Sequence, residues 1–145
     1  MNKFTTSKSR TALFLMELII AILFFSIASP VCMQLFAKAH LTSVKTQELN
    51  KAVALAQSYA ETFRGTDGSM ESLNAIFPEA DTAGDCAKIY YDNDFNASDA
   101  ENAAYLGDIT ISSKDAVSNI TIVFTKLSDN SEVYRLTAAK YRGTL

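Results

Sequence analysis

The sequence predicts an α+β fold in which one long N-terminal helix packs on a small antiparallel β-sheet. Three observations predict it: an uncharged apolar run over residues 18–37, apolar residues at three- and four-residue spacing over residues 49–63, and short alternating segments after residue 88. Because the chain has 145 residues, only one small domain fits beyond such a helix.

The first half of the helix, residues 13–37, is expected to cross a membrane. The uncharged run spans roughly 30 Å at ~1.5 Å per residue, which matches the hydrocarbon layer of a bilayer. Three basic residues precede it: Lys3, Lys8 and Arg10. Since such residues stay inside, the N-terminus is expected in the cytoplasm and the following domain outside it. A cleaved signal peptide ending near residue 28 has the same polarity, but Glu17 interrupts its apolar core.

The second half of the helix, residues 38–64, is predicted to be amphipathic. Its apolar face contains residues at helical spacing: Leu49, Ala52, Val53, Ala56, Tyr59, Ala60 and Phe63. No glycine occurs before Gly65, so one helix is expected from Leu13 to Arg64, ended by that glycine. Pro30 removes a backbone hydrogen bond and marks a helix kink, unless it is a proline that the membrane helix tolerates without consequence.

Residues 65–145 are expected to form the extracytoplasmic β domain. A short helical stretch around Leu73 stops at Pro78, and four strands follow it. The strands are expected over residues 88–91, 109–111, 120–124 and 133–137, the last two as a hairpin. The apolar face of their sheet would cover the stripe on the helix.

Charge and composition exclude several functions. Eleven carboxylates lie from residue 65 to residue 115 against two lysines, so no direct binding of nucleic acid is expected. His40 is the only histidine, which leaves no Ser–His–acid arrangement, and we expect neither an enzyme nor a cofactor. Cys32 lies in the apolar run and Cys86 in the polar domain, so both are expected as free thiols.

One polar loop has partial calcium-loop spacing. Residues 92–98 read DNDFNAS, which places oxygen-bearing side chains at alternate positions. Ala97 replaces the glycine of such a loop and Ala103 replaces its final bidentate acid. We therefore favour an ordinary turn, in which Asp and Asn bond their own backbone, over a metal site.

Residues 8–23 read KSRTALFLMELIIAIL and resemble the N-terminal signature of type IV pilins and pseudopilins. The resemblance implies that residues 1–12 are a leader peptide, that a prepilin peptidase cuts between Ala12 and Leu13, and that Leu13 is then N-methylated. Glu17 becomes the fifth residue of the mature chain. The expected long helix and small sheet are similar to the pilin fold.

Three departures from the family pattern favour a minor or pseudopilin-like subunit over a major one. The family prefers glycine before the cut, where this chain has Ala12. Many members begin their mature chain with Phe, where this chain has Leu13. Pro30 also falls earlier than the proline of major pilins.

Glu17 has a physical reason to act in assembly. A carboxylate within a membrane helix costs a few kcal/mol unless it is neutralised. Cleavage before Leu13 creates an α-amino group four residues away, or within reach in a packed neighbour, and such a pair can set the register between subunits. The alternative is that Glu17 lies at the cytoplasmic interface and reaches water without any role.

The expected function is that of a single-pass inner or cytoplasmic membrane protein that joins other pilin or pseudopilin subunits in a surface filament. The filament is a type IV pilus, or the equivalent in competence or type II secretion. The alternative is a signal-anchored or secreted small extracytoplasmic domain that binds a ligand. The sequence does not choose among the three machines.

Overall fold

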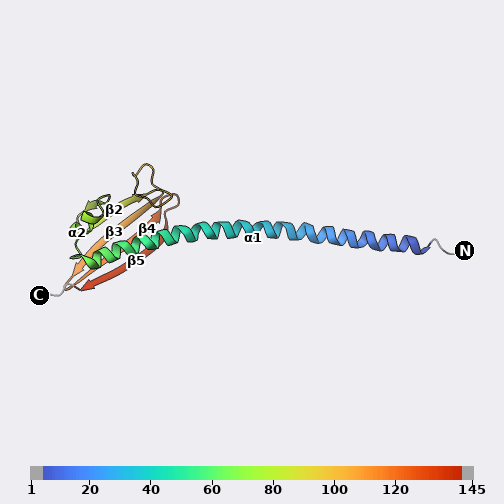
Figure 1. The fold of residues 1–145 in the computed structure, drawn as a ribbon, viewed down its shortest axis with the longest axis horizontal. Coiled ribbons are helices and arrows are strands. Elements are labelled where there is room, and N and C mark those ends of the chain that lie inside the picture. The colour runs from blue at the N-terminus through green and yellow to red at the C-terminus, as the bar shows by residue number, and fades with distance from the viewer. Residues whose placement is uncertain (1–4, 142–145) are drawn as a thin grey trace. The chain divides into compact units, whose positions relative to one another are not determined.

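The computed structural model describes residues 5–141, with side chains from Arg10 onward, and confirms the α+β arrangement (Figure 1). Its elements follow in this order: α1 (Thr5–Gly65), α2 (Met70–Ile76), β1 (Asp81–Ala83), β2 (Cys86–Tyr91), β3 (Tyr105–Lys114), β4 (Val117–Lys126) and β5 (Ser131–Tyr141). The chain divides into two units, one up to Lys45 and one from Thr46. Lys3, within the expected leader, lies outside the described residues.

Helix α1 is longer than the sequence predicts. It begins at Thr5 and so includes the second part of the expected leader, where no glycine or proline interrupts the backbone. Helix propagation is favourable once a helix exists, which accounts for the earlier start. The helix continues through Pro30, and the Ser26 hydroxyl donates to the Ile22 carbonyl at 2.8 Å one turn before it.

The sheet has five strands in the order β1-β2-β3-β4-β5, and every neighbouring pair is antiparallel. Four of them overlap the expected strands, and the β4–β5 hairpin is confirmed. The prediction of four strands missed β1, because all three of its residues are exposed and show no alternation. Strands β3 to β5 also extend beyond their apolar centres into polar residues.

The core of the second unit lies between the sheet and the C-terminal part of α1. Five of the seven stripe residues are buried at the centre of this contact, namely Ala52, Ala56, Tyr59, Ala60 and Phe63. They pack with inward side chains of the sheet, which include Ile89, Ile109, Ile122 and Phe124. Leu49 is 40% exposed, so close packing on the sheet begins at Ala52, one turn later than the periodicity predicts.

Candidate functional site

The first unit exposes a continuous apolar surface. Among the described side chains from Arg10 to Lys45, only Ala28 is partly covered by its own chain. The exposed fraction reaches 68% at Phe24 and 78% at Phe36. Within the described residues, α1 contains one stretch that is long and apolar enough to cross a membrane. Such a surface is stable only when lipid or other protein covers it.

The expected cleavage and assembly residues all lie on α1. Ala12, Leu13 and Glu17 are exposed, and the last two are four residues apart. Residues at this spacing lie on the same face of a helix, one turn from each other. In the described part of the chain, the Glu17 carboxylate makes no ion pair with another side chain. The helix places Leu13 and Glu17 on one face of α1.

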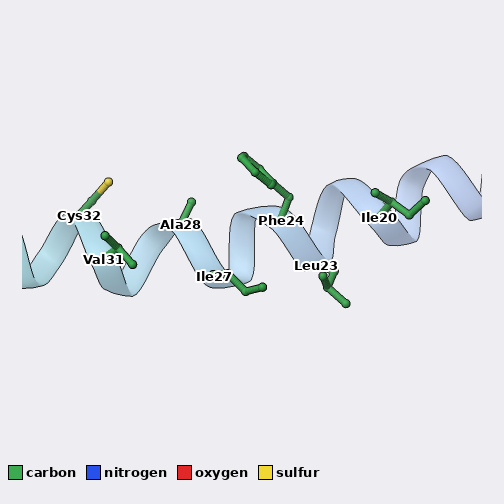
Figure 2. A pocket seen from close by; sticks show the side chains of 7 residues that line it. All are labelled: Ile20, Leu23, Phe24, Ile27, Ala28, Val31 and Cys32. Carbon is green, nitrogen blue, oxygen red and sulfur yellow. The ribbon is translucent and has the colours of Figure 1, made fainter.

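A shallow apolar hollow lies further along the same helix. Figure 2 shows Phe24, Ala28 and Cys32 in one row and Leu23, Ile27 and Val31 in the next, with Ile20 at one end. The small Ala28 side chain leaves a gap between the two larger neighbours in its row. Gaps between such rows receive the side chains of a second helix when helices pack. This hollow can therefore accept an apolar side chain from another membrane helix.

The second unit is held together by contacts that the sequence analysis missed. Lys126 donates to Glu48 at 2.7 Å, which joins the end of β4 to α1, and Lys51 pairs with Asp94 at 3.3 Å. The hydrogen bond from Lys126 holds the pKa of Glu48 below its usual value, and the same bond raises the pKa of Lys126. The Lys126 ammonium also lies 5.7 Å from the centre of the Tyr105 ring.

Two tyrosines link the helix to the sheet inside the core. The hydroxyls of Tyr59 and Tyr91 form a buried hydrogen bond, and burial raises the pKa of both phenols. At the end of α1, Lys140 donates to the carbonyls of Arg64 and Thr66. A cation at this position satisfies backbone acceptors and complements the negative end of the helix dipole. No sequence spacing indicates these pairs, because their members are 32 to 76 residues apart.

The loop with calcium-like spacing forms a turn closed by its own hydrogen bonds. One oxygen of Asp92 accepts from the backbone N–H groups of Asp94 and Asn96 at 2.8 and 2.9 Å. These bonds hold the pKa of Asp92 below its usual range. Phe95 adopts φ 64° at the bend and its ring stacks on Tyr105 with centroids 4.2 Å apart. The carboxylate therefore organises the turn, as we expected for an Asx-type loop.

The remaining sequence candidates lie apart from one another. His40 is exposed on α1, and both Cys32 and Cys86 are exposed free thiols in different units. In the part of the chain that the structure describes, no three side chains of the His, Cys, Asp or Glu type gather in a way that could hold a metal ion. Comparison with protein-family models, with curated proteins and with solved structures finds no match to this chain.

Proposed function

We propose that this protein is a non-enzymatic, membrane-anchored, pilin-like subunit that is cleaved by a prepilin peptidase and then assembles into a filament. The observation that carries the proposal is the exposed apolar surface of α1, with the single carboxylate of Glu17 one turn beyond the Ala12–Leu13 bond. A simple membrane anchor needs the apolar surface but has no use for a carboxylate within it.

The two halves of α1 have different surroundings, and both support the proposal. Residues 18–37 have the length and composition of a membrane span, whereas residues 52–63 form one wall of a folded core. The first surface therefore has two partners of similar chemistry, lipid before assembly and the apolar helices of other subunits afterwards. Because apolar helices gain little by leaving lipid for one another, specific pairs such as a carboxylate and an amino group must supply selectivity.

Cleavage between Ala12 and Leu13 tests the proposal. We expect the full chain, expressed in bacterial membranes with a prepilin peptidase, to begin at Leu13 and to carry an N-methyl group when analysed by mass spectrometry. Ala12→Gly should be processed at least as well. Ala12→Leu should accumulate uncut, because a bulky side chain replaces the small residue beside the bond.

Two other N-termini would contradict the proposal. An uncut chain that still begins at Met1 would indicate a permanent membrane anchor. A chain that begins near Ser29 would indicate an ordinary signal peptide and a secreted domain. Equal processing of Ala12→Leu and the unchanged protein would show that this bond is not the one cleaved.

A further inference from the structure

A polar groove lies in the second unit between the last turns of α1 and strand β5. Its volume is about 320 Å³; Gln57, Ala60, Glu61 and Arg64 line it from the helix, and residues 136–138 line it from the strand. The small side chains of Ala60 and Ala138 leave this space open. Arg64 is exposed in the last turn of α1, and its guanidinium makes no ion pair within the described residues.

Strand β5 borders this groove with an open edge. Among residues 5–141 it is the last strand of the sheet, so alternate backbone N–H and C=O groups point away from β4 and meet no described strand. Its four residues between Arg135 and Lys140 are uncharged, and the irregularity in the β4–β5 ladder lies before them, at Phe124/Thr125. Charges and bulges are what normally blunt an edge, and both are lacking in this segment.

The β1–β2 hairpin forms the opposite edge of the sheet, and the Ile111 N–H of β3 donates to the Asp85 carbonyl in its turn at 2.8 Å. Strand β1 is only three residues long, and all of them are exposed. Gly84 and Asp85 connect it to β2, with Gly84 at φ 63°, so the hairpin tip presents the carboxylate of Asp85. The tip is therefore narrow and acidic, whereas the groove at the far edge contains the unpaired guanidinium of Arg64.

One row of paired residues crosses the sheet and connects these two edges. Ala83 pairs with Cys86, Cys86 with Thr110, Thr110 with Thr121, and Thr121 with Thr137. This row runs from the hairpin at one edge to the groove at the other. A second copy displaced sideways along the row, in the same orientation, would bring its hairpin tip level with Thr137.

We propose that the groove between α1 and β5 binds the β1–β2 hairpin of a second copy of this chain. The inference rests on the proposed function, because it assumes that copies assemble with the same orientation. Opposite charges favour the contact, because Asp85 of the hairpin would lie near Arg64 of the groove. A second pair has the charges reversed, with Lys88 on the hairpin strand and Glu61 in the groove. Because the two surfaces differ, each copy keeps one free, and the contact propagates in an open series.

Crosslinking between the hairpin and the groove tests the contact. The full-length chain carries Cys32→Ser and Cys86→Ser, to remove the native thiols, with Ala83→Cys on β1 and Thr137→Cys at the groove, because this displacement makes Ala83 and Thr137 neighbours. We expect oxidation in intact cells to give a ladder of dimers, trimers and longer species of this chain alone, because every copy supplies both thiols. Ser128→Cys, exposed in the β4–β5 turn, is the matched control and should give no ladder.

Charge reversal provides the second measurement. Arg64→Glu should weaken ladder formation about tenfold, and adding Asp85→Arg should restore it. Processing at Leu13 and recovery of sheared filaments are measured in the same cells. Absence of a ladder from filaments that contain processed chain would overturn the contact and leave the proposed function standing. A ladder that stops at dimers, or a crosslink to a different protein, would also overturn it. Unprocessed chain without filaments or ladder would contradict both proposals.

Discussion

Gly107 illustrates how single residues determine the packing of the sheet domain. A Cβ atom built on it would lie 3.1 Å from ring carbons of both Phe124 and Tyr91. Because both rings are buried, neither can move away without disturbing the core. We expect Gly107→Ala to lower the free energy of unfolding by about 1–3 kcal/mol, measured in urea on the full chain in detergent micelles.

Gly65 is the matched control for that substitution. A Cβ atom at Gly65 would meet no atom within 4 Å. Gly65→Ala should therefore leave the midpoint of the urea transition almost unchanged. Equal effects of the two substitutions would contradict the packing that we describe around Gly107.

The hydroxyl pair of Tyr59 and Tyr91 makes a second prediction at this scale. Tyr59→Phe leaves the buried Tyr91 hydroxyl without its partner, which should cost about 1–3 kcal/mol. Replacing both tyrosines by Phe removes both polar groups and should cost less than either single change. A double-mutant cycle in urea measures the coupling, and strictly additive effects would contradict the hydrogen bond.

The same pair predicts how stability depends on alkaline pH. Burial raises the pKa of both phenols above the ordinary value of 10.0, so the folded protein favours their neutral forms. Their contribution is fully present below that value and is lost as the pH rises above it. Near-UV circular dichroism should show alkaline unfolding at a higher pH in the double Phe variant than in the unchanged protein.

At the scale of elements, the ion pair of Glu48 and Lys126 ties α1 to the end of β4. Glu48→Gln should lower stability by about 1 kcal/mol near neutral pH, because the two side chains are only partly exposed. The pKa of Glu48 lies below its ordinary value of 4.5, so the stabilisation is present above 4.5 and is lost as the pH falls. Glu61→Gln, exposed on the same helix, is the control and should have little effect.

The sequence was sufficient to predict the elements whose residues show strong periodicity. Spacing of Ala52, Ala56 and Phe63 identified the buried face of α1, and alternation identified the centres of four strands. It could not predict β1, whose residues are all exposed, because a strand held only by backbone bonds has no side-chain pattern. The helix start was also missed, since residues 5–12 show no apolar periodicity and join α1 by propagation.

Some residues of the candidate sites could be proposed from the sequence, and others could not. Ala12, Leu13 and Glu17 lie within one local motif, residues 8–23, so sequence reading could propose them. The groove between α1 and β5 depends on residues 57–64 and 136–138, which meet only through the sheet register. No local sequence pattern indicates which of these distant residues meet. The pairs Tyr59–Tyr91 and Glu48–Lys126 could not be predicted for the same reason.

At the scale of the whole molecule, the two units differ in what covers their apolar side chains. The first unit exposes apolar side chains that need lipid or other helices, and the second unit buries its own apolar residues in a core. In the proposed function, Glu17 is the residue that distinguishes an assembly subunit from a simple anchor. Glu17→Val removes a charge from an apolar surface, so insertion should become easier by on the order of 2–3 kcal/mol.

Recovery of Glu17→Val in sheared filaments, relative to its amount in the membrane, tests the central claim most directly. We expect the variant to insert, to be processed at Leu13 and to accumulate in the membrane. It should be lost from filaments because it lacks the carboxylate that we propose to pair with a neighbour's amino group. Ser29→Val, also a polar-to-apolar change on α1, should assemble normally. Recovery of Glu17→Val at the level of the unchanged protein would contradict the assembly role of Glu17.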